Sequence, residues 1–303
     1  APAALCDDVI MGWLLSVGRP RKVLLIVAVT NLTNLALDYW LVIELGMLTE
    51  GVALGSLLSS LSGLILGLYL VQGATKSMPV RLDRKQLFRI SGYIRLMQVN
   101  RYLLIRTLCL LFSFSFFYAQ SAQQPSATLS ANSIIMTMLM VFSYGADGFA
   151  NAAEVLTGRA IGARQLDRFY AACRATLLWF FIASALFALV VLTMEVPIIR
   201  LLTDIRSVIL ETRIYWPWLL VLPLVASWNF MLDGIFLGAG KARAMQYCML
   251  FASFFVFLPA WHLTRPLANH GLWLAFCFFQ AARTISMAVV YYYYSQKQLW
   301  IKD

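Results

Sequence analysis

The 303-residue chain has little charge. Charged residues make up 13% of it and hydrophobic residues 61%, whereas soluble domains hold roughly one quarter and one half. A water-soluble fold of this size needs more surface charge, so the composition excludes an ordinary soluble domain. The net charge of +10 does not indicate nucleic-acid binding, because the basic residues lie in short clusters between apolar runs and not in one patch.

Signatures of metal binding and catalysis are also scarce. The only histidines are His262 and His270, and none of the five cysteines forms a C-x-x-C pair, so we expect no metal site and small, buried, reduced cysteines. The chain lacks a Walker A sequence, G-x-S-x-G and H-E-x-x-H. We therefore expect no cofactor and no enzymatic activity, with a gradient of H⁺ or Na⁺ as the energy source. A membrane-embedded acyltransferase is the alternative class, but neither histidine has a carboxylate nearby in the sequence.

Long apolar runs dominate what the chain does contain. About 20 such residues cross the hydrocarbon core as a helix. The pattern predicts an all-α polytopic membrane protein with a half-span at 1–17 followed by eight full spans, near 23–45, 51–72, 97–119, 128–153, 170–194, 212–238, 243–262 and 271–294.

The loops alternate in charge. Basic residues follow every second span, whereas Gly46–Glu50 and Ser121–Ala127 contain no Lys or Arg. This pattern predicts that the basic loops and the C-terminus face the cytoplasm, with 195–211 as the weakest fit. Tryptophans are expected at the headgroup level of the helix ends, namely Trp40, Trp216, Trp218, Trp261, Trp273 and Trp300.

An internal repeat relates the two ends of the chain. Gly12–Arg21 resembles Gly234–Arg243 at an offset of 222 residues, and Gly51 matches Gly271 at an offset of 220. Both copies run in the same direction through the predicted membrane, which indicates a parallel repeat of six helices, as in transporters with two like halves.

The repeat predicts the domain organisation. Residues 87–303 would form a complete C-terminal lobe of six helices. Residues 1–86 would hold only the end of the N-terminal lobe, that is, the end of helix 4, helices 5 and 6 and the start of the loop between the lobes. About eight and a half helices are then present, and we expect the chain to be a piece of a longer protein. The segment 76–95, basic with interleaved apolar residues, is predicted to be a cytoplasmic connector ending in an interfacial amphipathic helix.

A polar stripe lies in the span 23–45. Asn34 and Asp38 are separated by one helical turn and share a face, with Asn31 close by, and Ser56 of the next span is a further candidate. Placing an ionisable group inside a bilayer is energetically unfavourable, so such a residue is a candidate for a functional role. The stripe predicts a carboxyl group that loads and releases a proton; a hydrated structural acid is the alternative.

A second set of charges lies in the predicted C-terminal lobe. Arg106 and Arg283 fall in the middle of spans, and unpaired charges there would be very unfavourable, so buried ion pairs are expected. These residues line a cavity or gate, or they lock helices together; the full set is Arg101, Arg106, Asp147, Glu154, Asp233 and Arg283.

Two other patterns concern packing. Small residues recur every four positions at Ser59, Gly63 and Gly67, and again at Gly158 and Gly162, which indicates close helix contacts. The aromatic stretch 112–117 and the methionines of 136–140 line an apolar cavity for drugs, or they are ordinary core or lipid-facing residues. Pro217 and Pro223 kink or hinge the span 212–238.

The ordered set of motifs resembles the multidrug and toxic compound extrusion (MATE) transporters, and within them the DinF branch. The matching stretches are Gly12–Leu15, Asn31 with Leu37–Val42, Asn100-Arg101 with Arg106, Asp147–Ala150, Ala153-Glu154, Gly158, Gly162–Arg164, Leu232–Gly234 with Phe236 and Gly238, Leu272–Ala275, and Arg283.

This resemblance implies twelve helices in two six-helix lobes and export by alternating access. It implies H⁺- or Na⁺-coupled antiport of amphipathic, often cationic, drugs by a monomer in the bacterial inner membrane. Asn34 and Asp38 match the polar pair of the family's N-lobe cation site, whose partner acid belongs to helix one. The alternative function is a flippase of lipid-linked precursors from the same superfamily, for which Arg101, Arg106 and Arg283 would line a cationic cavity.

Overall fold

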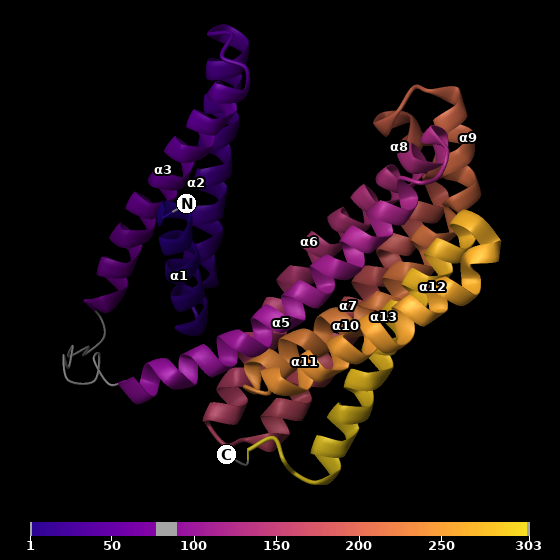
Figure 1. Ribbon diagram of the computed structural model, residues 1–303. Coiled ribbons are helices and arrows are strands. Elements are labelled where there is room, and N and C mark those ends of the chain that lie inside the picture. Colours follow the sequence, from indigo (N-terminus) through magenta and orange to yellow (C-terminus); the bar gives the residue numbers. More distant parts are fainter. Residues whose placement is uncertain (1, 77–89, 302–303) are drawn as a thin grey trace. The chain divides into compact units, whose positions relative to one another are not determined.

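The computed structural model describes residues 2–76 and 90–301, and within these ranges it contains helices and no strand. The all-α prediction is confirmed. The chain divides into two compact units, Ala1–Arg89 and Ile90–Asp303, drawn indigo to purple and magenta to yellow (Figure 1). The division lies three residues after the boundary expected between 86 and 87. Most of the expected amphipathic connector, at 77–89, lies outside the described residues.

Over residues 2–76 the first unit is a bundle of three helices (Figure 1). They are α1 (Pro2–Ser16), α2 (Pro20–Asp38) and α3 (Thr49–Thr75), and α2 continues as a π-helical segment, η1 (Tyr39–Glu44). Helix α3 packs against both α1 and α2. Its buried face consists of small residues four apart, which let the neighbouring helices approach closely: Gly51, Gly55, Ser59, Gly63 and Gly67.

The second unit is built around α10 (Pro217–Gly238), which packs against α6, α7 and α13 and contains many buried residues. The other helices are α5 (Ile90–Ser121), α6 (Ser126–Gly162), α7 (Leu166–Thr193), α8 (Glu195–Leu202), α9 (Arg206–Tyr215), α11 (Ala242–Leu250), α12 (Leu258–Thr264) and α13 (Ala268–Gln296), with a π-helical segment η2 (Phe251–Phe257) and a 3₁₀ turn η3 (Arg265–Leu267).

Seven helical segments of the described chain are long and apolar enough to cross a membrane, one fewer than the eight full spans expected. The difference lies at Ala242–Gln296, a helical run of 55 residues that counts once. This run contains the two predicted spans 243–262 and 271–294. It turns at η3, where Ala268 has a φ of +51°, and α13 packs back against η2 and α12.

The predicted span 212–238 is interrupted at Trp216, whose φ of −53° and ψ of −36° remain helical. Pro217 has no N–H to donate and begins α10. The preceding segment, expected to be a loop over 195–211, forms the two short helices α8 and α9. Pro223 lies inside α10, and the Ser227 hydroxyl bonds the carbonyl oxygen of Pro223.

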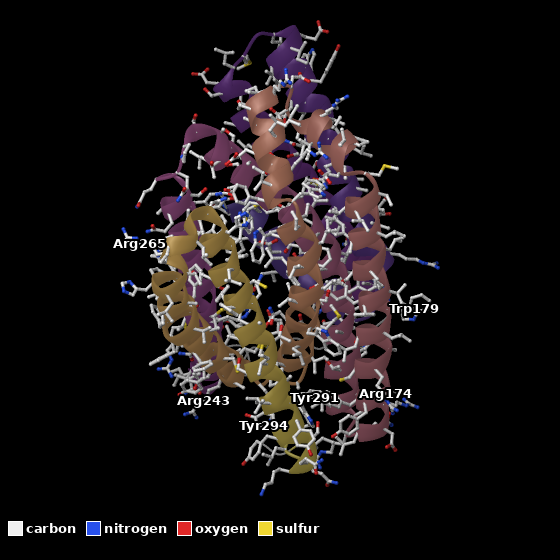
Figure 2. All side chains as sticks on the ribbon, turned by 90° about the vertical axis from the view of Figure 1, so that its right-hand side faces the viewer. Arg174, Trp179, Arg243, Arg265, Tyr291 and Tyr294 are labelled. Carbon is white, nitrogen blue, oxygen red and sulfur yellow. The ribbon has the colours of Figure 1, made fainter. Side chains whose placement is uncertain are left out.

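Helix α7 presents an apolar surface on the outside of the second unit. Its exposed side chains are apolar along most of its length, including Leu178, Leu186 and Trp179, which is 63% exposed. Figure 2 shows Trp179 and Arg174 directed away from the body of the helices. A soluble protein does not present such a surface to water, and the outward apolar face is the one that contacts lipid.

Three of the tryptophans expected at the headgroup level are buried inside the unit: Trp216, Trp273 and Trp300 are at most 2% exposed. Each indole N–H has an acceptor inside the unit, so burial leaves no indole donor without a hydrogen bond. The acceptors are Val191 O at 3.0 Å, Asn132 Oδ1 at 2.8 Å and Ser295 Oγ at 3.0 Å, respectively.

The predicted repeat is reproduced in detail where α1 and α10 end. Gly18 and Gly240, 222 residues apart, have φ values of +80° and +69°. The amide N–H of Gly18 donates to Leu15 O and that of Arg19 to Leu14 O; 222 residues later Gly240 donates to Leu237 O and Lys241 to Phe236 O. This is the helix-ending arrangement for which glycine is favoured.

Candidate functional site

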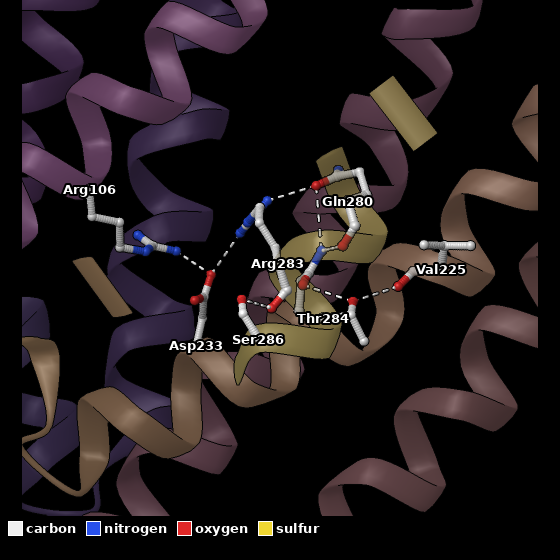
Figure 3. Close-up of polar contacts among 8 residues, drawn as sticks. Arg106, Val225, Asp233, Gln280, Arg283, Thr284 and Ser286 are labelled. Carbon is white, nitrogen blue, oxygen red and sulfur yellow. Dashed lines mark hydrogen bonds and ion pairs between the residues drawn. The ribbon is translucent and has the colours of Figure 1, made fainter. Parts of the chain in front are cut away.

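The second unit contains a buried cluster of charged and amide side chains. Asp233 on α10 accepts from two arginines through the same oxygen, Oδ2. Arg283 on α13 reaches it through Nη2 at 3.1 Å, and Arg106 on α5 reaches it through Nη2 (Figure 3). The side chain of Arg283 is 6% exposed and that of Asp233 13%. The ion pairs expected of the two mid-span arginines are therefore present.

Amide and hydroxyl groups extend this cluster along α13. Arg283 Nη1 donates to Gln280 Oε1 at 2.8 Å, and the Asn229 amide donates to the carbonyl oxygen of Gln280 at 3.0 Å. The Thr284 hydroxyl lies 2.8 Å from Asn229 Oδ1 and 3.0 Å from Val225 O. The chain of contacts joins α5, α10 and α13 (Figure 3). Because it lies in an apolar bundle, any helix movement that separates these groups leaves charge unpaired.

Glycines beside Asp233 set the position of α10. A Cβ on Gly234 would collide with the carbonyl oxygen of Ala150, and one on Gly238 with that of Glu154. Helix α10 thus touches the backbone of α6. Of the two small residues predicted to pack on α6, Gly158 faces Gly238, whereas Gly162 has no neighbour within contact distance of a Cβ.

The remaining charged residues of the predicted set form no ion pair with this cluster, although Asp147 lies close enough to interact electrostatically with Arg106 and Asp233. Asp147 and Arg101 are exposed and Glu154 is half-buried, and none of the three forms an ion pair with another described residue. Arg101 lies over the ring of Tyr102 at 5.3 Å. The core of two arginines and one aspartate carries one positive charge, and the Nε groups of Arg106 and Arg283 are buried without a hydrogen-bond partner in the described chain.

An apolar cavity adjoins the cluster at Gln280. It has a volume of about 80 Å³ and its lining includes Phe114, Met136 and Met140, part of the aromatic and methionine set considered for a drug cavity. Phe112, from the same stretch, is exposed. A drug-sized ligand needs about 300 Å³ or more, so the cavity is too small for one in this conformation.

The first unit holds the predicted stripe on α2. Asp38 is the last α-helical residue before the π-helical segment η1, a deviation found frequently at functional sites. Its carboxylate lies against Gly55 of α3, in the space that a Cβ there would occupy. Oδ1 of Asp38 is buried and has no hydrogen-bond partner among the described residues. A buried carboxylate oxygen without a donor is a site that a cation or a proton stabilises.

The other members of the stripe are less enclosed. Asn34 is half-buried, and Asn31 and Ser56 are exposed. On α3 it is Gly55, the residue before Ser56, that meets Asp38. The assignment of these four residues to one cation site stays a prediction.

One acidic residue of α1 was missed from the sequence. Asp7 is 7% exposed, and its Oδ1 is buried without a hydrogen-bond partner in the described chain. Its Oδ2 lies next to Gly63 of α3, beside the hydroxyl of Thr30 from α2. The available signal was an aspartate within an apolar run, but the adjacent Asp8 carries the same signal and is exposed.

Comparisons with known proteins agree on one family. Residues 103–261 match the MatE family model. The chain is 34% identical to the DNA damage-inducible protein F of Escherichia coli K12 over 305 residues, which is 99% of this chain and 65% of that protein. It thus spans about two thirds of the length of this relative.

Solved structures share the fold at low sequence identity. A MOP superfamily transporter from Pyrococcus furiosus, described as having a binding pocket of reverse polarity, matches with a TM-score of 0.84 at 15% identity, covering 98% of this chain and 67% of that one. The MATE transporter ClbM, in complex with Rb⁺, matches with a TM-score of 0.73 at 15% identity, over 94% of this chain and 63% of that one. These similarities concern the fold.

Proposed function

This chain belongs to the MatE family of membrane transporters, and from that premise we propose that it works as a cation-coupled antiporter. In this proposal an inward flow of H⁺ or Na⁺ drives export of amphipathic, often cationic, drugs across the bacterial inner membrane. The protein alternates between states open to either side. A relative with the same fold is described with bound Rb⁺, which supports a monovalent cation as the coupling species.

The observation that carries the proposal is the carboxylate of Asp38. It lies in an apolar three-helix bundle, and Oδ1 is buried and unpartnered. An isolated charge in such surroundings is unfavourable, so the group gains stability when it binds a cation or a proton. A site that is stable only when loaded favours different helix arrangements in its loaded and empty states, which coupling requires.

The test uses the protein expressed from its intact gene. Asp38→Asn keeps the size of the side chain and removes its charge, so we expect loss of drug efflux at unchanged membrane abundance. Glu44→Gln, an exposed acid on η1, is the matched control and should retain efflux. Accumulation of a fluorescent drug is measured in everted vesicles with the H⁺ and Na⁺ gradients set separately. Normal efflux by Asp38→Asn would refute the coupling assignment.

A flippase of lipid-linked precursors is the second candidate. The observation that favours it is that the two arginines Arg106 and Arg283 share the single carboxylate of Asp233. Anionic pyrophosphate groups pair well with guanidinium groups. In the same assay a flippase gives no difference in drug accumulation between everted vesicles from cells with the gene and from cells without it, under either gradient.

A further inference from the structure

From the geometry of the first unit we propose that Asp7 is a second proton-binding carboxyl, distinct from Asp38 and held between α1, α2 and α3. That this proton takes part in transport rests on the proposed function; the site itself does not. Asp7 is 93% buried, since 7% of its surface is exposed. Its Oδ1 has no hydrogen-bond donor within the described chain, which an ionised carboxylate in an apolar bundle needs.

The other carboxylate oxygen defines the site. Oδ2 of Asp7 lies 2.9 Å from the position that a Cβ on Gly63 would take, and Oγ1 of Thr30 lies against the same point. Three helices thus bring one carboxyl and one hydroxyl together over a residue without a side chain. A hard metal cation takes about six oxygen ligands, and this arrangement supplies too few. A proton needs only the carboxyl, and the resulting O–H can donate to a neighbouring oxygen.

No basic residue in the described chain neutralises Asp7. On its own helix the nearest charge is Asp8, an exposed acid. On α2 the charged residues are Arg21 and Lys22 at its start and Asp38 at its end, and Lys22 donates to Leu70 O. On α3 the only charged residue is Glu50, in the first turn. Burial disfavours the ionised carboxylate of Asp7, and the like charge of the neighbouring Asp8 adds to this effect, so both favour the protonated form.

Asp7 and Asp38 lie along the same face of α3. Asp38 contacts Gly55 and Asp7 contacts Gly63, which are eight residues or about 12 Å apart along the helix. The buried Ser59 lies between them. Beyond Asp7, Ile10 and Ile26 pack on Gly67 and seal that end with apolar side chains. Asp7 and Asp38 therefore contact separate positions on one helix, with Ser59 between them.

The test measures the carboxyl directly. Infrared difference spectra between alkaline and acidic buffer, on the purified protein from its intact gene in lipid nanodiscs, report the C=O stretch of each carboxyl that takes up a proton. We expect one such band to be lost in Asp7→Asn and retained in Asp38→Asn. Asp8→Asn, the exposed neighbour, is the control and should retain it. Thr30→Val, which keeps the side-chain size, should shift the frequency of the band without removing it.

The outcomes separate this site from the proposed antiport. An unchanged spectrum in Asp7→Asn, or an equal loss in Asp8→Asn, overturns the proposal. If Thr30→Val leaves the band where it was, the three-helix site is wrong even if Asp7 titrates. Efflux by Asp38→Asn refutes the coupling assignment while leaving the Asp7 band intact. Conversely, if Asp7→Asn removes no band from the parent spectrum and Asp38→Asn is inactive in efflux, only the proposal for Asp7 is refuted.

Discussion

Asn132 of α6 shows how one polar side chain joins three helices. Its amide donates to Ser121 Oγ at 2.6 Å and to Asn269 Oδ1 at 2.7 Å. Its carbonyl oxygen accepts from Asn269 Nδ2 at 2.9 Å and from Trp273 Nε1 at 2.8 Å. Every donor and acceptor of this buried amide is therefore used, and its partners on α5 and α13 tie both helices to α6.

Asn132→Leu should destabilise the protein by about 2–4 kcal/mol, because buried donors lose their acceptor at about 1–3 kcal/mol each. The donors left unpaired are the Trp273 indole and the Asn269 amide. Ser133→Ala is the control, since that hydroxyl bonds only the Leu129 carbonyl of its own helix, and it should change little. The midpoint of thermal unfolding in detergent measures both. Equal midpoints for the two variants would show that the network adds no stability.

Single residues also show how far the sequence could predict the site. Arg106 and Arg283 were identifiable because charge in the middle of an apolar run must be paired, whatever the partner. The choice of Asp233 over Asp147 could not be made, since it depends on which face of α6 and α10 the glycine contacts turn inward. Asp7 could not be separated from Asp8 for the same reason: burial depends on neighbouring helices that lie far away in the sequence.

At the scale of elements, four helix ends share one backbone arrangement. Gly18, Arg164, Gly240 and Gln298 follow α1, α6, α10 and α13, and all have positive φ. In each case the residue after them donates its N–H to a carbonyl five positions earlier. In the sequence the repeat matched Gly18 with Gly240 but did not predict their conformation. Nor did the sequence indicate this arrangement at Arg164 and Gln298, because residues with a side chain seldom adopt this conformation.

Gly240→Ala should lower stability by about 1 kcal/mol. A Cβ at Gly240 meets no atom within 4 Å, so the expected loss comes from backbone strain at a φ of +69°. Gly145→Ala is the matched control, because its Cβ also meets nothing but the residue lies inside α6. There alanine should stabilise by about 0.5–1 kcal/mol. Thermal unfolding of the two variants should therefore shift in opposite directions, and a shared direction would contradict the strain argument.

For the whole molecule, the number of membrane crossings depends on the run Ala242–Gln296. Its two arms are each long enough to cross a hydrocarbon core of about 30 Å at 1.5 Å per residue: the first extends from Ala242 to Thr264, and the second is α13. The turn between them, at η3, exposes Arg265. Hydropathy in the sequence separated the two arms as spans 243–262 and 271–294, and η3 lies in the gap between them.

Two crossings place the turn and the C-terminal end of α13 on opposite sides of the membrane. A cysteine introduced by Arg265→Cys should react with an impermeant maleimide added to intact spheroplasts. A cysteine from Lys297→Cys, also exposed, should react only after permeabilisation, since the alternation of basic loops places the C-terminus in the cytoplasm. The parent protein measures the background from its five native cysteines. Labelling of both positions from the same side would mean that Ala242–Gln296 does not cross twice, which would leave seven full crossings in the described chain.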